Sequence, residues 1–284
     1  MTKYIAITPA RDEEKFLPLL IGSMAAQNLK PDRWIIIDDG SVDATAAILD
    51  EAARTYSWIE PHHLPRNRPR APGGECVTSQ FLPHAACQEY DYVVRLDADV
   101  SFEDGFIDLL LEEFARDPKL GIASPTLYEP KGADWVEIRQ PEYHTRGPAK
   151  MYSLACFTAI GELDSDVGWD TLDEARAMML GFRTRAFRHI TARHLRPQGE
   201  ASGWKARMMA GLAAYRVGYS PLFMIARAAR HTFSTPFPFS GALMLAGFLN
   251  GYIRGEPRCA EPELVRFIRR LQHRRLFLQE SLWR

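Results

Sequence analysis

The alternation of short apolar strands with longer segments of helical period constrains this chain more than any other feature of its sequence. Residues Lys3–Thr8 and Arg33–Asp38 are short runs rich in aromatic and β-branched residues, as expected of buried strands. Between them, Glu13–Ala26 places its apolar residues on one helical face, and such a face needs a sheet to pack against. This alternation predicts an α/β fold in which helices flank a mostly parallel central sheet.

Acidic residues follow two of the predicted strands. Strand Arg33–Asp38 continues into Asp39, and strand Tyr92–Leu96 continues into Asp97-Ala98-Asp99. In open α/β sheets, the carboxyl ends of the strands face the crevice in which ligands bind. Carboxylates at this edge are suitable ligands for a divalent cation, although an isolated Asp-x-Asp is also a common solvated turn.

Capping residues and turn residues define the remaining elements. Ser41 or Asp43 is expected to accept the free backbone amides at the start of the second helix. Gly181 is expected to end a later helix, because glycine readily adopts the left-handed backbone that closes helices. The other elements expected are a proline- and arginine-rich loop at 61–74, a helix at Phe106–Phe114, a strand at Gly121–Ser124, an irregular polar segment as far as Lys150, and a helix at Thr171–Leu180.

Charge and cysteine content indicate a cytoplasmic protein that does not bind nucleic acid. The 284 residues include 35 basic and 36 acidic side chains, so the net charge of −1 gives no general attraction for a polyanion. The four cysteines do not have the close spacing of a zinc site or a redox dithiol, and we expect reduced thiols. The N-terminus lacks the pattern of a secretory signal, because acidic residues follow the first apolar run.

The C-terminal part, 226–284, is expected to be a helical extension that associates with a membrane. Between His231 and Arg254 there is no charged residue, but prolines and glycines interrupt the run, which favours an interfacial or re-entrant segment over a spanning helix. Glu261–Trp283 alternates arginines with apolar residues, as an amphipathic helix on an anionic surface would. A homodimer interface or a helix that caps the core is the alternative for the uncharged run.

Several motifs follow one another in a characteristic order. They are Ile7-Thr8-Pro9-Ala10-Arg11-Asp12-Glu13, Ile37-Asp38-Asp39-Gly40-Ser41-Val42-Asp43-Ala44-Thr45, Asp97-Ala98-Asp99, and Gly168-Trp169-Asp170 with Gly181-Phe182. In this order the chain resembles the family-2 glycosyltransferases with the GT-A fold, from about Lys3 to Pro221. The resemblance implies a Rossmann-like GT-A domain at 1–225. Two positions depart from the family pattern: Asp12 replaces a common asparagine, and Trp169 replaces a usual glutamate.

The resemblance also implies roles for individual residues. Asp99 and His194 would bind Mn2+ or Mg2+, and Asp97 would reach the metal or the ribose. Asp170 would be the general base, with Asp173 and Glu174 as rival candidates for that role. The residues implied to contact the nucleotide sugar are Pro9, Ala10, Glu13 and Asp39 at the base and ribose, and Arg146 or Lys150 at the diphosphate.

The function implied is inverting transfer of a sugar from a nucleotide-sugar donor, by family habit a UDP-sugar. The acceptor would be a glycan or a lipid-linked glycan in surface polysaccharide synthesis, at the inner face of the cell membrane. Two alternatives remain open, namely a polyprenyl-phosphate sugar synthase and a non-catalytic nucleotide-sugar-binding protein. A dinucleotide-binding dehydrogenase is disfavoured, because no Gly-x-Gly-x-x-Gly follows either opening strand.

Overall fold

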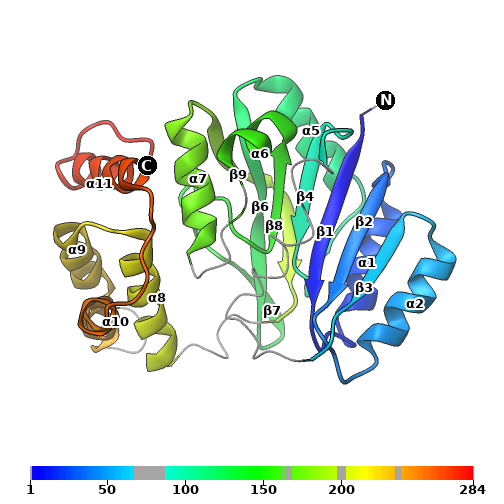
Figure 1. The fold of residues 1–284 in the computed structure, drawn as a ribbon, viewed down its shortest axis with the longest axis horizontal. Coiled ribbons are helices and arrows are strands. Elements are labelled where there is room, and N and C mark those ends of the chain that lie inside the picture. Colours follow the sequence, from blue (N-terminus) through cyan, green and yellow to red (C-terminus); the bar gives the residue numbers. More distant parts are fainter. Residues whose placement is uncertain are drawn as a thin grey trace.

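The computed structural model describes residues 2–66, 87–161, 163, 168–196, 203–233 and 238–283 (Figure 1). The strands are β1 (Tyr4–Ala10), β2 (Arg33–Asp38), β3 (Ile59–His63), β4 (Tyr92–Leu96), β5 (Val100–Phe102), β6 (Leu120–Lys131), β7 (Asp134–Glu137), β8 (Ala149–Ser153) and β9 (Arg183–His194). The helices are α1 (Leu17–Ala26), α2 (Thr45–Thr55), α5 (Phe106–Arg116), α6 (Leu154–Ile160), α7 (Trp169–Met179), α8 (Trp204–Val217), α9 (Pro221–His231), α10 (Ser240–Arg254) and α11 (Pro262–Leu276).

The strands form one mixed sheet, which confirms the predicted α/β class. The order of the strands is β3-β2-β1-β4-β8-β6-β9-β5, and β7 pairs with β6 outside this path. Strands β1 to β4 are parallel to one another, whereas β5, β7 and β8 run antiparallel to their neighbours. The parallel part is the part that the alternating sequence pattern predicts.

The direction of the strands brings distant parts of the chain to one edge of the sheet. β1 pairs in parallel with β2 and β4, so the chain leaves these three strands at the same edge. β8 runs antiparallel to both β4 and β6, which gives β6 the direction of β4. β9 is parallel to β6 and therefore also ends at this edge. We call this edge, where β1, β2, β4, β6 and β9 end, the carboxyl edge.

Helices cover both faces of the sheet. Alternate residues of a strand point to opposite faces, so Ala6 of β1 faces α1, α2 and α5, whereas Ile5 and Ile7 face α6 and α7. Both groups of side chains are buried in continuous apolar clusters. This two-sided burial explains why the opening strands contain few polar residues.

A helical layer packs on the outer side of α7 (Figure 1). It consists of α8 to α11 and buries apolar side chains against Leu172, Ala175 and Met178 of α7. The layer starts earlier than the predicted extension at 226–284, because α8 begins at Trp204 and residue 225 lies inside α9. The apolar residues of α8 and α9 belong to the same cluster as those of α10 and α11, so these helices form one unit.

One prediction about the C-terminal part needs correction. The apolar face of α11, with Leu264, Ile268 and Leu271, is buried against the protein and is therefore not available to a membrane. The uncharged run after His231 contains α10, which packs on α8 and α9. Within the described residues, no helix has both the length and the apolar character needed to cross a bilayer.

Other differences concern single elements. β6 extends to Lys131, well beyond the predicted strand Gly121–Ser124, and β3, β5, β7, β8 and β9 were not predicted. The predicted loop at 61–74 begins instead with the end of β3, and its residues 67–74 lie outside the described part of the chain. Pro61 is tolerated there because β3 is at the edge of the sheet. Gly181 has a φ of +91° just after α7, as expected of a residue that closes a helix.

Glycines allow α8 and α10 to approach each other closely. A Cβ atom added at Gly247 of α10 would lie 2.0 Å from the carbonyl oxygen of Met208 in α8. A Cβ atom added at Gly211 of α8 would lie 2.0 Å from the carbonyl oxygen of Met244 in α10. Both contacts are with backbone atoms, so the two helices would have to separate to accommodate a side chain.

We therefore predict that Gly247→Ala lowers the free energy of unfolding by about 1–3 kcal/mol, which is typical of overpacking. The control is Gly22→Ala in α1, where an added Cβ atom meets nothing within 4 Å. Because alanine favours a helix over glycine by about 1 kcal/mol, this control should stabilise the protein. Urea denaturation measures both effects. Equal stabilisation by the two substitutions would contradict the close packing of α8 and α10.

Candidate active site

Asp97, Asp99 and His194 meet at the carboxyl edge. Asp97 and Asp99 lie in the turn that joins β4 to β5, and His194 is the last residue of β9. The backbone fixes this turn, because Asp97 N–H donates to the carbonyl of Pro148 and Leu195 N–H donates to the carbonyl of Asp99. β5 then pairs with β9 so that Val100 lies opposite His194. Pairing of β5, which the sequence pattern does not reveal, therefore places the histidine beside the two aspartates.

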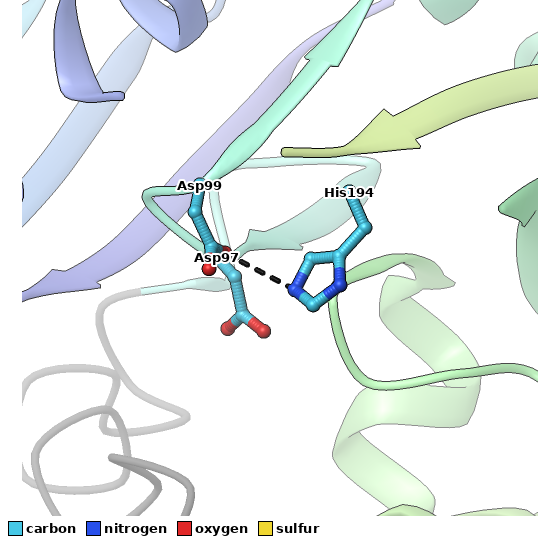
Figure 2. A group of neighbouring side chains, drawn as sticks. All are labelled: Asp97, Asp99 and His194. Atoms are coloured by element: carbon cyan, nitrogen blue, oxygen red, sulfur yellow. Dashed lines mark ion pairs between the residues drawn. The ribbon is translucent and has the colours of Figure 1, made fainter. Parts of the chain in front are cut away.

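The three side chains surround one small space (Figure 2). Each offers a ligand atom, and these atoms all lie within 4.8 Å of one another. The Nε2 atom of His194 is 3.3 Å from an oxygen of Asp99. Ligands on opposite sides of one divalent cation are about 4–5 Å apart, so the spacing is suitable for an ion. Two carboxylates and an imidazole are a donor set that suits Mn2+, and carboxylates also suit Mg2+.

The pKa values of the two aspartates shift in opposite directions. Burial raises the pKa of Asp97; the charge of Arg95 opposes this, and the charge of Asp99 adds to it. Burial on its own would also raise the pKa of Asp99, but the hydrogen bond from His194 and the charges of His194 and Arg196 lower it. Asp99 is therefore held as a carboxylate, which is the form that binds a cation.

Glu129 orients the histidine. Its carboxylate lies 3.2 Å from Nδ1 of His194, while Nε2 of the ring faces Asp99. A carboxylate that accepts a hydrogen bond from one ring nitrogen fixes the orientation of the imidazole and leaves the other nitrogen free to bind a metal. Glu129 was not among the predicted site residues, because it lies in the part of β6 beyond the predicted strand.

The residues expected to bind the nucleotide lie at the ends of β1 and β2. Ala10 accepts a backbone hydrogen bond from Asp39, which ties the two strand ends together. Asp39 forms an ion pair of 3.1 Å with Arg11. Glu13 is buried and accepts a hydrogen bond from Arg196, which also lies 3.7 Å from Asp99. Arg196 thus links the predicted nucleotide residues to the predicted metal ligands.

Asp12, which replaces the common asparagine of the family pattern, has a backbone conformation that explains this exchange. Its φ is +56°, a left-handed backbone conformation that asparagine and aspartate adopt more readily than other side chains. Its carboxylate accepts the backbone N–H of Val42, and its own N–H donates to the hydroxyl of Ser41. Ser41 therefore does not cap the second helix as expected, whereas Asp43 accepts the backbone N–H of Thr45, as predicted for a residue at the helix start.

Trp169, which replaces the usual glutamate of the family pattern, contacts basic side chains near the site. Two cations lie over its ring, with the Arg95 guanidinium 4.5 Å and the Lys150 ammonium 4.9 Å from the ring centroid. Arg95 also forms an ion pair of 2.9 Å with Asp97 and donates to the carbonyl of Gly147. Through Arg95, the indole thus connects the start of α7 to the turn that carries the aspartates.

Lys150 is not placed to contact a diphosphate, contrary to the prediction. Its side chain is 0% exposed, and its ammonium donates to both carboxylate oxygens of Asp173, at 3.0 and 2.9 Å. Tyr152 donates to the same carboxylate at 2.6 Å. Burial raises the pKa of Asp173 to about 6, and Lys150 opposes this shift. The pair is a buried ion pair that fixes α7 to β8.

Of the three candidate bases, Asp170 alone keeps exposed surface. The Asp173 carboxylate is held by Lys150 and Tyr152, and the Glu174 carboxylate accepts hydrogen bonds from Thr145 and His144. The side chains of Asp173 and Glu174 are 1% and 2% exposed. Asp170, in the first turn of α7, is half-buried, so its carboxylate can meet a ligand.

Arg146 connects Asp170 to the histidine site. Burial lowers the pKa of Arg146, and the negative charges of Asp170 and Glu129 oppose this shift. Both carboxylates therefore lie near its guanidinium. Because Glu129 also contacts His194, the predicted base and the predicted metal ligands belong to one electrostatic network.

We predict that Glu129→Ala weakens Mn2+ binding by roughly 10- to 100-fold, the usual effect of losing a carboxylate that orients a ligand histidine. Glu129→Gln should retain much of the affinity, because its amide oxygen can still accept from Nδ1. Glu137→Ala in the exposed strand β7 is the matched control. Isothermal titration calorimetry with MnCl2 measures all four proteins. Unchanged affinity in Glu129→Ala would refute the orienting role of this carboxylate.

Comparison with known proteins finds similarity to glycosyltransferases. A curated relative, the 4,4'-diaponeurosporenoate glycosyltransferase of Staphylococcus haemolyticus, is 28% identical over 122 residues. This match covers 42% of the present chain and 30% of the relative, so the chain spans less than a third of that protein.

Solved structures of glycosyltransferases share the fold. TarS 1–349 of S. aureus in complex with UDP-GlcNAc matches with a TM-score of 0.56 and 16% identity, over 94% of this chain and 78% of that one. The mannosyltransferase PcManGT of Pyrobaculum calidifontis, in complex with GDP-Man and Mn2+, matches with a TM-score of 0.55 and 16% identity, over 98% and 76%. The fold is therefore that of the GT-A glycosyltransferases.

The model of glycosyl transferase family 2 matches residues 5–163, which contain β1, β2, β4 and the Asp97-Ala98-Asp99 turn. The chain belongs to glycosyl transferase family 2.

Proposed function

We propose that this protein transfers a sugar from a nucleotide-sugar donor to a glycan or lipid-linked glycan acceptor in surface polysaccharide synthesis, with inversion at the anomeric carbon. The observation that carries the proposal is the meeting of Asp97, Asp99 and His194 at the carboxyl edge, with ligand atoms within 4.8 Å of one another. This is where an open α/β sheet binds its ligand.

Asp99 and His194, with Asp97 beside them, would hold Mn2+ or Mg2+. When bound, the cation neutralises the charge that develops on the diphosphate leaving group. Pro9, Ala10, Glu13 and Asp39 would contact the base and ribose, because they lie at the adjoining ends of β1 and β2. Arg146 is half-buried near Glu129 and Asp170, so its guanidinium would be placed to contact the diphosphate.

Asp170 would act as the general base. It would take the proton from an acceptor hydroxyl as the oxygen forms its bond to the anomeric carbon and the bond to the diphosphate breaks. Attack from the side opposite the leaving group inverts the anomeric centre. The carboxylates of Asp173 and Glu174 are occupied by buried hydrogen bonds, which supports Asp170 over these two rivals.

The structural neighbours support a nucleoside diphosphate sugar as the donor class. TarS was solved with UDP-GlcNAc and PcManGT with GDP-Man, so the likeness leaves both nucleotides open, and we favour UDP-sugars. A polyprenyl phosphate as the acceptor is the second candidate. The exposed apolar side chains of the helical layer favour it, because they could contact the lipid chain of such an acceptor. Either acceptor is consistent with a peripheral position at the inner face of the cell membrane.

We predict that Asp170→Asn lowers the rate of transfer by about 10²- to 10⁴-fold, the usual contribution of a general base, and leaves donor binding intact. The donor is first identified by a thermal-shift panel of UDP-, GDP- and dTDP-sugars with MnCl2, since a ligand that binds the native state raises the melting temperature. Transfer is then followed as nucleoside diphosphate release in the presence of acceptor.

The control for this experiment is Asp104→Asn, at an exposed aspartate in the turn before α5. Full turnover by Asp170→Asn would remove this residue from the role of base. Binding of the donor without turnover by the wild-type protein would favour a non-catalytic nucleotide-sugar-binding protein. If no nucleotide sugar changes the melting temperature in the presence of Mn2+, the donor site is assigned wrongly.

A further inference from the structure

Helix α10 exposes an apolar stripe on its outer face. Its inner face packs on α8 and α9, and Met244 and Phe248 on that face are buried. Residues three or four positions apart lie on one side of a helix. The outer side consists of the exposed residues Phe239, Ala242, Ala246, Leu249 and Ile253, of which Phe239 is 63%, Leu249 55% and Ile253 83% exposed. A helix that is apolar on all sides is normally covered on all sides, so this stripe requires a second apolar environment.

Helix α9 carries a second stripe of the same kind. Its exposed apolar residues are Leu222, Ile225, Ala229 and, just beyond the helix, Phe233, which is 83% exposed. The two helices are in contact, since a Cβ atom added at Gly241 of α10 would lie 2.1 Å from the carbonyl oxygen of Ala228 in α9. Figure 1 shows α9 and α10 on the far side of α8 from the sheet, so their outer faces border the solvent.

Most charges around these stripes are positive, although Glu256, just after α10, pairs with Arg216 of α8. Residues 201–255 contain six lysines and arginines and no aspartate or glutamate, although the whole chain has a net charge of −1. The basic side chains also gather in space, because burial and the positive charges of Arg227, Arg207 and Arg230 together lower the pKa of His231. Arg254 is exposed directly after the end of the α10 stripe. An apolar surface flanked by cations matches a surface of anionic lipids.

We propose that the outer face of α9 and α10 docks the protein on an anionic phospholipid surface. A second copy of the chain is less favoured as the occupant, because two faces with this excess of positive charge would repel each other. The apolar side chains would insert among the acyl chains, and the arginines would contact the phosphate groups. This proposal moves the membrane contact away from α11, whose apolar face is buried.

The position of α10 is consistent with the proposed function. This inference rests on the proposed function only for the location of the acceptor at a membrane. In Figure 1, α10 lies at the level at which β1 ends, whereas α11 lies at the opposite level of the helical layer. The end of the helical layer that carries α10 is therefore at the same level as the carboxyl edge. A lipid that contacts α10 would hold an anchored acceptor nearer to the level of the proposed site than to the level of α11.

The test is cosedimentation of the full chain with phosphatidylglycerol–phosphatidylcholine vesicles and with phosphatidylcholine vesicles alone. The wild-type protein should bind the anionic vesicles more tightly. The double variant Leu249→Ser/Ile253→Ser should bind them at least about tenfold more weakly, because it removes apolar surface that is exposed in the folded protein. The double variant Arg230→Gln/Arg254→Gln should lose about tenfold or more, and only toward the anionic vesicles.

The matched control is Leu19→Ser/Leu180→Ser, which removes two leucines with an exposure close to that of Leu249 from α1 and from the end of α7. It should bind vesicles like the wild-type protein. Circular dichroism and the melting temperature establish that each variant folds. Equal binding by the wild type and the Leu249→Ser/Ile253→Ser variant would overturn the proposal. A wild-type dimer in light scattering that this variant dissociates, without vesicle binding, would overturn it in favour of a second copy.

The failure of this inference is distinguishable from the failure of the proposed function. The melting-temperature shift with Mn2+ and nucleotide sugars is measured in solution on the same variants, and it should be unchanged by substitutions on α10. Loss of vesicle binding with a normal donor shift supports the docking surface. Vesicle binding by a wild-type protein that no nucleotide sugar stabilises would refute the donor site and leave the docking surface standing.

Discussion

The close approach of negative charges at the carboxyl edge is the constraint on which the rest of the site depends. Asp97 and Asp99 lie two residues apart in one turn and would repel each other without nearby cations. Arg95 pairs with Asp97, and its guanidinium also stacks on Trp169, the first residue of α7. His194 contacts Asp99 from the end of β9. The contacts that neutralise the two carboxylates thus connect the β4–β5 turn to α7 and to β9. The space between Asp97, Asp99 and His194 lies at the centre of these contacts.

The sequence predicted the parts of the fold that depend on local pattern. The opening strands are continuous apolar runs because both of their faces are buried, so their positions and parallel pairing follow from composition and spacing. Asp97 and Asp99 could be proposed as ligands because they follow a strand directly. His194 was proposed from its distance to Asp170 in a family resemblance. Its place beside Asp99 results from the β5–β9 pairing, which no local pattern indicates.

Other features depend on contacts between distant residues and could not be predicted. Lys150 was expected at a diphosphate because the family resemblance places it in a loop before the base, yet it is buried in an ion pair with Asp173. The apolar residues of α11 have the spacing of a membrane-surface helix, and the same spacing serves packing against α7. Amphipathic periodicity indicates that one face is covered but does not identify the partner. Glu129 gives no signal in the sequence, because its role depends only on its contact with His194.

The proposed function requires that the space between Asp97, Asp99 and His194 holds a divalent cation together with a nucleoside diphosphate. Anomalous diffraction at the manganese edge, from crystals grown with MnCl2 and UDP or GDP, tests it most directly. We expect one anomalous peak at coordination distance, about 2–2.6 Å, from an Asp99 oxygen and from Nε2 of His194, with a diphosphate oxygen as a further ligand. A manganese peak elsewhere, with nucleotide bound and this space empty of metal, would contradict it.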